Sequence, residues 1–327
     1  MSTASSYAYA VGNIRAKESA YLKKLDIEQL LSYDKVTECA SFLKDKGYGF
    51  AETPTDVFSL LKDEEQKLWE YIISISPDVS VFDSFIIQND YHNIKAIFKG
   101  TVVKADYEKL LLKPTIIDVK AIEKAAREQD FSGLPQYMVS AAKKAWAALV
   151  QTGDSQVCDA ILDASCLEYK MACADSIKIP MLADMIKARV FFDNIKASIR
   201  CARAQKSPDF CDVCLTDTDI FTKKTLKEAA LKGVDEVIAL LETAAKYKGD
   251  EAAEAFKISP SQFEKFADNF ITASLRKAKY IAVGAEPIIA YFGAKLAEIQ
   301  AVRIVVNGIA SGEPQDKTRE MLRELYG

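Results

Sequence analysis

The sequence predicts an all-α protein made of amphipathic helices. Three observations support this class. Apolar residues recur at spacings of three and four in almost every segment, whereas the alternation typical of strands is limited to a few residues around Val102 and Val103. Loop-forming residues are scarce, with 13 glycines and 9 prolines in 327 residues. Finally, a helical motif returns along the chain, which is typical of repeat architectures.

Two long helices carry recognisable start signals. They lie in the segments ETPTDVFSLLKDEEQKLWEYIIS and ISPSQFEKFADNFITASLRKAKYI. A small polar residue before a proline is typical of a helix N-cap, and a glutamine three residues after the cap completes a capping box. In the first helix, Thr53 is the predicted N-cap, Pro54 occupies the first helical position and Asp56 lies in the first turn. In the second helix, Ser259 is the predicted N-cap, followed by Pro260 and, three residues after the cap, by Gln262.

The composition is that of a globular protein, 49% hydrophobic and 28% charged, long enough for two or three domains. A net charge of −4 argues against a nucleic-acid-binding surface, which needs clustered positive charge.

The first residues lack the basic start and apolar core of a secretory signal. The most apolar stretch, IIAYFGAKLAEIQAVRIVV, is interrupted by Lys295, Glu298, Gln300 and Arg303, so we expect no membrane span. Any membrane connection should run through a partner protein.

Seven cysteines, an odd number without an export signal, indicate reduced thiols in the cytosol. Cys211 and Cys214 have the spacing of a zinc hook, but no second such pair follows and the single histidine, His92, is distant in sequence. We therefore predict no metal site. Three further cysteines share one stripe of a helix and are expected to be small buried hydrophobes: Cys158, Cys166 and Cys173.

The tetrapeptide N-I-K-A begins at Asn93 and again at Asn194, 101 residues later. A third copy fits 107 residues further on, where Ala301 takes the place of the asparagine. In this alignment apolar residues recur at positions i, i+3 and i+7, which form one buried face of a helix. The aligned sets are Tyr91, Phe192 and Ile299; Ile94, Ile195 and Val302; and Phe98, Ile199 and Val306.

The ends of the three copies are also alike. Gly100 and Gly308 are expected to stop the first and third helices, whereas Cys201 stands at this position in the second. A proline lies fourteen to sixteen residues before each aligned position, and we expect it to open the long helix that carries the motif; these prolines are Pro77, Pro180 and Pro287. The period predicts three similar helical domains, at residues 1–106, 107–207 and 208–327.

The sequence lacks the common catalytic motifs. It contains no G-x-x-x-x-G-K-[ST] phosphate loop, no G-x-S-x-G and no H-E-x-x-H. The segment NGIASGEP has two glycines but follows a helix rather than a strand, which argues against a dinucleotide site. We therefore predict no catalytic residue and no cofactor. Three copies of one helical unit, closed around an axis or stacked, are suited to binding something large.

Four segments resemble the C-subunit family of V-type/A-type ATPases (ATP synthases), whose eukaryotic counterpart is the d subunit. The most specific part is the pattern E-P-x-I-A-Y-x-x-A-K-x-x-E-I, at residues 286–299. The resemblance covers essentially the whole chain and departs from the family pattern at Ala301, usually asparagine, and at Cys201, usually glycine. The segments are YAYAVGNIRAKESAYL, DYHNIKAIFKG, FFDNIKASIRCA and RKAKYIAVGAEPIIAYFGAKLAEIQAVRIVVNG.

This resemblance implies three helical domains around a pseudo-threefold axis, forming a funnel or socket. It implies a non-catalytic rotor subunit of the central stalk, present in one copy per complex. Its partners would be the shaft subunits of the stalk and the membrane ring of proteolipid subunits, during ATP-linked ion transport. The location would be cytoplasmic, peripheral to the membrane through the complex.

Four basic residues are candidates for the partner interface. Lys95, Lys196 and Arg303 occupy equivalent positions in the three copies, where they could meet acidic groups of a partner. The alternative is that they lie beside the core and form ion pairs within their own domains. Arg15 is a further candidate, although Glu18, three residues later, could pair with it inside one helix.

Two other function classes are compatible with the residues. A free-standing helical scaffold or adaptor would present a concave surface and need no membrane partner. An enzyme using cysteine chemistry at Cys211 or Cys214 would need a thiol with a lowered pKa.

Overall fold

The computed structural model describes residues 3–52 and 56–326. Every regular element in these residues is a helix, and no β-strand occurs among them, which confirms the predicted all-α class. The chain forms two compact units. Unit 1 comprises Met1–Val79 and Glu254–Gly327, and unit 2 comprises Ser80–Ala253. The division into three domains at 1–106, 107–207 and 208–327 stays a prediction.

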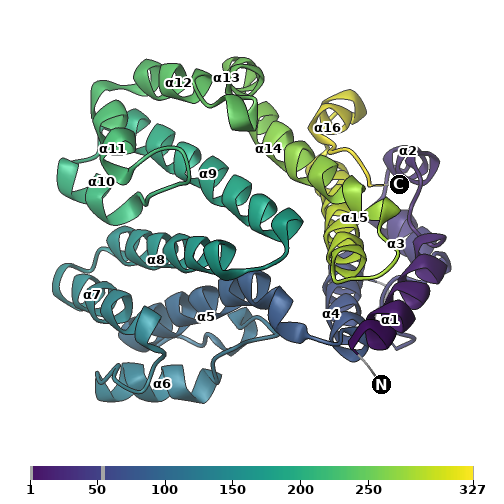
Figure 1. The fold of residues 1–327 in the computed structure, drawn as a ribbon, viewed down its shortest axis with the longest axis horizontal. Helices are drawn as coiled ribbons and strands as arrows, with labels where there is room; N and C mark the ends of the chain where they lie inside the picture. The colour runs from purple at the N-terminus through teal and green to yellow at the C-terminus, as the bar shows by residue number, and fades with distance from the viewer. Residues whose placement is uncertain (1–2, 53–55, 327) are drawn as a thin grey trace. The chain divides into compact units, whose positions relative to one another are not determined.

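Unit 1 is built around one long helix, α15 (Glu286–Ser311). Buried residues lie on all sides of this helix, as expected for a helix enclosed by others (Figure 1). The helices that pack against it are α1 (Thr3–Glu18), α2 (Lys24–Leu31), α3 (Val36–Asp45), α4 (Val57–Ile75), α14 (Pro260–Leu275) and α16 (Gln315–Met321). The short 3-10 helix η4 (Arg276–Tyr280) follows α14. The boundary between the units falls within α13 (Gly249–Ile258), whose residues from Glu254 onward belong to unit 1.

Unit 2 is layered around α8 (Ser155–Ser176). Figure 1 shows α8 with α5 (Asp83–Val103) and α7 (Gln136–Thr152) on one side and α9 (Pro180–Arg203) and α10 (Pro208–Cys214) on the other. Three more helices cover these layers: α6 (Val119–Glu128) packs on α5, and α11 (Lys223–Lys232) and α12 (Val234–Glu242) pack on α9. The short 3-10 helices are η1 (Val79–Phe82), η2 (Glu108–Leu110) and η3 (Ala245–Tyr247).

The helix starts agree only in part with prediction. Thr53 and Pro54 lie outside the described residues. Asp56, predicted in the first turn, is instead the N-cap of α4, since its carboxylate accepts a hydrogen bond from the Ser59 N–H at 2.9 Å. Ser259 does cap α14, as predicted. The Ser259 N–H donates to the Ala255 carbonyl rather than to the Gln262 side chain, whose amide donates to the Glu320 carbonyl, so the predicted capping box is only half formed.

The aligned apolar positions of the three copies are confirmed as core. All nine side chains are at most 4% exposed. Pro180 and Pro287 lie in the first turns of α9 and α15, as predicted. The prediction for Pro77 is wrong, because this residue lies in a bend before η1 and α5 begins at Asp83.

The glycines of the first and third copies do not stop their helices, contrary to prediction. The helices continue for three more residues, and Lys104 and Gly312 end them in the left-handed conformation. Gly100 and Gly308 are instead sites of close packing: a Cβ atom would lie 2.3 Å from a ring carbon of Tyr107 at the first and 2.4 Å from the Thr318 hydroxyl at the second.

The three helix ends nevertheless share one hydrogen bond. The carbonyls at the aligned positions, Gly100, Cys201 and Gly308, each accept from the N–H five residues later, at 3.0, 3.0 and 2.8 Å. This is the outer bond of a Schellman-type helix end. The three copies therefore end in the same local structure even though a cysteine replaces glycine in one of them.

The asparagines of the N-I-K-A motif hold the segment that follows each helix. Asn93 and Asn194 are fully buried. The Asn93 amide donates to the Leu112 carbonyl at 3.0 Å and accepts from its N–H at 2.8 Å. Asn194 accepts from the Thr216 N–H and donates to its hydroxyl, both at 2.9 Å. Ala301 has no side-chain amide with which to form this contact in the third copy.

A buried ion network ties the elements of unit 1 together. It consists of Glu64 on α4, Lys295 and Glu298 on α15, and Tyr48 after α3. The Lys295 ammonium lies 2.5 Å from the Glu298 carboxylate and 3.2 Å from that of Glu64. Tyr48 donates its hydroxyl to Glu298 at 2.6 Å. All four residues are at most 8% exposed.

The carboxylates of the buried ion network also hold the backbone. The Leu22 N–H donates to Glu298 at 2.7 Å, and the Gly49 N–H donates to Glu64 at 3.0 Å. Burying charges is unfavourable unless each is paired and hydrogen-bonded, and here both conditions are met. Lys295 and Glu298 belong to the most specific segment of the sequence, residues 286–299.

We predict that Lys295→Met lowers the free energy of unfolding by roughly 3 to 5 kcal/mol, because it leaves the buried Glu298 carboxylate without its cation and Glu64 with only the more distant Lys67, at 3.6 Å. Urea unfolding followed by circular dichroism measures the change. The matched control is Lys317→Met, which removes an exposed lysine paired with Glu313 and should leave stability almost unchanged. Equal stability of the two variants would contradict a structural role for the buried ion network.

Candidate functional site

A basic groove in unit 2 is the best candidate for a binding site. It has a volume of about 720 Å³ and is lined by residues of α5, α8, α9 and α10. Six cations and three carboxylates line it, which gives an excess of positive charge in a chain whose net charge is −4. The cations are Lys95, Lys170, Lys196, Arg200, Arg203 and Lys206, and the carboxylates are Asp159, Asp163 and Asp193.

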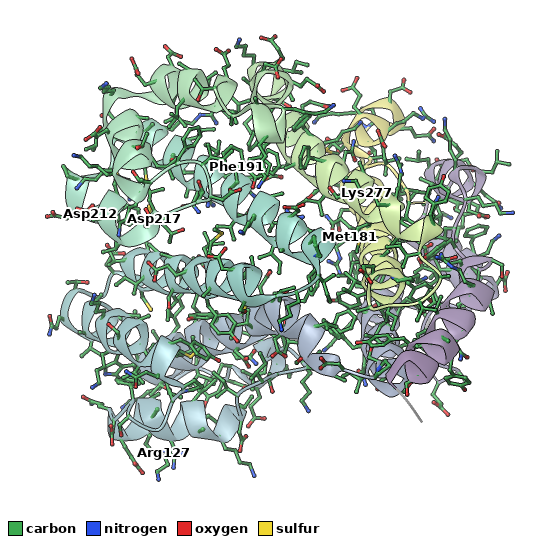
Figure 2. The ribbon with its side chains drawn as sticks, viewed as in Figure 1. Arg127, Met181, Phe191, Asp212, Asp217 and Lys277 are labelled. Carbon is green, nitrogen blue, oxygen red and sulfur yellow. The ribbon has the colours of Figure 1, made fainter. Side chains whose placement is uncertain are left out.

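The basic groove owes its chemistry to one face of α9. Asp193, Lys196 and Arg200 are spaced by three and four residues, so they follow one another along the same side of the helix. Phe191, labelled in Figure 2, lies on the opposite side of this helix. Its buried ring packs against those of Phe221 and Tyr247. The apolar face therefore fixes the rotation of α9, and this rotation turns the charged face towards the groove.

The structure brings two predicted interface residues into this groove. Lys95 on α5 and Lys196 on α9 are 101 positions apart in sequence, yet both line it. Each also forms an ion pair. Lys95 lies 2.7 Å from Asp163 on α8, and Lys196 lies 2.8 Å from Asp193 on its own helix. These pairs are compatible with ion pairing beside the core, and the interface role of the two lysines stays a prediction.

The other two predicted interface residues lie in unit 1. Arg303 on α15 pairs with Glu65 on α4 at 3.5 Å and is 41% exposed at its side chain. Arg15 on α1 pairs with Glu18 at 2.7 Å, which is the intrahelical pair expected from their spacing. Its guanidinium also donates to backbone oxygens at the end of η4, at 2.9 Å from Ala278 and 3.1 Å from Lys279. Arg15 therefore links α1 to the segment after α14.

Four cations of the basic groove were not among the predicted residues. Arg200 and Arg203 follow Lys196 at i+4 and i+7, a helical spacing that could have revealed them. Arg200 is exposed, and its guanidinium forms no ion pair or hydrogen bond with the part of the chain that the structure describes. Lys170 is buried and donates to Gln88 at 2.9 Å. Only the packing of α8 on α5 brings Lys170 here, so no local sequence signal marks it.

Three cysteines gather where the basic groove meets α10. The sulfur of Cys201 on α9 lies 3.1 Å from that of Cys214 on α10, and both line the groove. The hydrogen bond between the two thiols raises the pKa of Cys201 and lowers that of Cys214. Burial raises the pKa of the neighbouring Cys211 to about 11. The sequence singles out Cys211 and Cys214 by their spacing but gives no sign that Cys201 is their neighbour.

Two of the three cysteines predicted to share a buried helical stripe are buried. Cys158 and Cys166 are buried, as predicted, whereas Cys173 is half-buried. His92 has its Nε2 2.9 Å from the Leu110 carbonyl. No group of three or more His, Cys, Asp or Glu side chains arranged to hold a metal ion is found in residues 3–52 and 56–326. In the same residues, no helix combines the length and apolar character needed to cross a bilayer.

Comparison with known proteins agrees with the sequence motifs. Residues 10–321 match the family described as ATP synthase (C/AC39) subunit. The chain is also similar to the C subunit of the V-type sodium ATPase of Enterococcus hirae, with 19% identity over 317 residues that cover 96% of this chain and 97% of the relative. The family match spans almost all of the 327 residues and reaches every segment that carried the resemblance. The chain therefore belongs to the ATP synthase (C/AC39) subunit family.

Proposed function

We propose that this chain is a non-catalytic subunit of a V-type ATPase that joins the rotating central shaft to the proteolipid ring of the membrane. The observation that carries the proposal is the family match over residues 10–321, supported by the similarity to the C subunit of a V-type sodium ATPase over nearly its whole length. The chain would sit on the cytoplasmic side, in one copy per complex. ATP hydrolysis and ion carriage would belong to other subunits.

A subunit that transmits torque needs stiff packing and wide contacts, because a flexible connection would absorb the rotation. The structural features of this chain favour stiffness. In unit 1, the buried ion network joins α4, α15 and two loop segments. In unit 2, Asn93 and Asn194 hold the segments that follow α5 and α9. These contacts support a mechanical role.

The predicted arrangement of three domains around a pseudo-threefold axis is part of this proposal. The common helix end at Gly100, Cys201 and Gly308 supports a triplicated unit, as do the nine buried apolar positions. In such an arrangement Lys95, Lys196 and Arg303 would occupy equivalent places around the axis. Arg15, on α1, would be a further candidate for contact with a partner subunit.

We assign partner binding to the basic groove of unit 2. Its excess positive charge would attract an acidic segment of a neighbouring subunit and orient it before contact. Arg200 is the best placed group, since it is exposed and its guanidinium has no ion-pair partner among the described residues. On binding, Lys95 and Lys196 would form new ion pairs with acidic groups of the partner, and their present ion pairs with Asp163 and Asp193 would weaken.

The first test is purification of the tagged chain from detergent-solubilised membranes of its own cells. We expect it to co-purify with ATP-hydrolysing subunits and with the proteolipid ring, identified by mass spectrometry. A chain in which Lys95, Lys196 and Arg303 are all reversed to Glu should be folded but recovered with less of both. Recovery of the wild-type chain free of ATPase subunits would overturn the proposal and favour a free-standing scaffold.

The second test addresses the groove by a single charge reversal. Arg200→Glu should slow association with the remaining complex roughly tenfold at low salt and reduce the salt dependence, because rim charges act mainly on the association rate. Arg127→Glu is the matched control, on α6 of the same unit (Figure 2). Surface plasmon resonance over a range of salt concentrations gives both rates. Identical association rates for the two variants would show that the partner binds elsewhere.

A further inference from the structure

Cys201 and Cys214 are placed as a reactive pair of thiols. Their sulfur atoms are 3.1 Å apart, so an approach of about 1 Å would reach the length of a disulfide bond. Cys201 is buried in α9, whereas Cys214 is the last residue of α10, is partly exposed and lines the basic groove. Cys214 is therefore the more exposed of the two thiols.

The surroundings distinguish Cys214 from the other cysteines. A hydrogen bond from the Cys201 thiol has the largest effect on Cys214 and lowers its pKa, although burial and the neighbouring Cys211 act in the opposite direction. The positive charges of Arg200 and Lys223 lower it further. Burial raises the pKa of Cys39, Cys158 and Cys211 to about 11 in each case. It also raises the pKa of the two remaining thiols, Cys166 and Cys173. Cys214 is thus the thiol with the largest fraction of thiolate near neutral pH.

We propose that Cys214 and Cys201 form a peroxide-reactive dithiol, which hydrogen peroxide converts into an intramolecular disulfide between α9 and α10. The inference rests on the geometry of the two thiols and does not depend on the proposed stalk function. Cys214 is the nucleophile towards the peroxide, and Cys201 is the resolving thiol.

The reaction balances in two steps. The Cys214 thiolate attacks one oxygen of the peroxide, the O–O bond breaks, and a sulfenic acid and hydroxide form; the hydroxide takes up a proton to give water. The sulfur of Cys201 then attacks the sulfur of Cys214, the S–O bond breaks, and the departing hydroxide leaves with the Cys201 proton as a second water. Two thiols lose two electrons in total, and one peroxide is reduced to two waters.

The neighbouring groups favour this order of events. The pKa of Cys201 is raised chiefly because its proton is shared with Cys214. Once Cys214 is a sulfenic acid, no thiolate remains there to hold that proton, so the largest of the effects that raise the pKa of Cys201 is removed, whereas the effect of burial remains. Cys211 is only 1% exposed, which keeps it from competing for the peroxide.

The disulfide would change the end of the basic groove. It would join the last residue of α10 to α9, close to where the Lys206 N–H bonds to the Cys201 carbonyl. It would also remove the partial negative charge of the Cys214 thiolate from beside Arg200. The groove would become more rigid and more positive in its oxidised state.

The test treats the folded full-length chain with hydrogen peroxide at neutral pH and follows it by intact mass and non-reducing peptide mapping. We expect a loss of two hydrogens, a linked peptide pair containing Cys201 and Cys214, and reversal by a thiol reductant. Cys214 should react at least roughly tenfold faster than any other cysteine. These measurements on the unmodified chain need no variant that could fail to fold.

Three serine variants then assign the roles. Cys201→Ser should stop at a sulfenic acid on Cys214, which a 1,3-diketone traps, and Cys214→Ser should abolish the fast reaction. Cys211→Ser is the matched control and should form the disulfide as the wild type does. A disulfide that includes Cys211, or oxidation of Cys214 no faster than that of Cys158, would overturn the proposal.

Discussion

The buried ion network of unit 1 is the constraint on which that unit depends. Burying a lysine and a glutamate one turn apart on an enclosed helix costs free energy unless neighbouring elements pair with them. Glu64 from α4, the hydroxyl of Tyr48 and the N–H of Leu22 do so. Glu64 lies on α4, whereas Tyr48 and Leu22 lie in the segments that follow α3 and precede α2. The network therefore links α4 and these two segments to defined positions on α15.

In unit 2, neutral side-chain amides rather than ion pairs fix the position of distant segments of the chain. Asn93 and Asn194 each bind the backbone of a segment about twenty residues later, so the chain after α5 and α9 returns to a defined place. A buried amide that satisfies both its donor and its acceptor specifies one register and excludes others. The N-I-K-A motif is thus a structural device in its two complete copies, and the lysine two residues after each asparagine lines the basic groove.

Periodic features were predictable from the sequence, whereas features that depend on distant partners were not. Tyr91, Ile94 and Phe98 repeat at the period of a helix, so their burial follows from spacing alone. The helix stop predicted at Gly100 is wrong because a glycine at a helix end and one in close contact with Tyr107 look alike in sequence. The meeting of Lys95 with Lys196, and of Cys201 with Cys214, requires knowledge of how α8, α9 and α10 pack.

As a stalk subunit, this chain would couple ATP hydrolysis to ion movement without taking part in either reaction. The most direct measurement of this role compares both activities in the same membrane vesicles, prepared from cells with and without the chain. Ion uptake is followed with sodium- and pH-sensitive dyes while phosphate release reports hydrolysis. We expect vesicles lacking the chain to lose ATP-driven ion uptake and to regain it when the purified chain is added. Ion uptake that is unchanged by removal of the chain would contradict the coupling role.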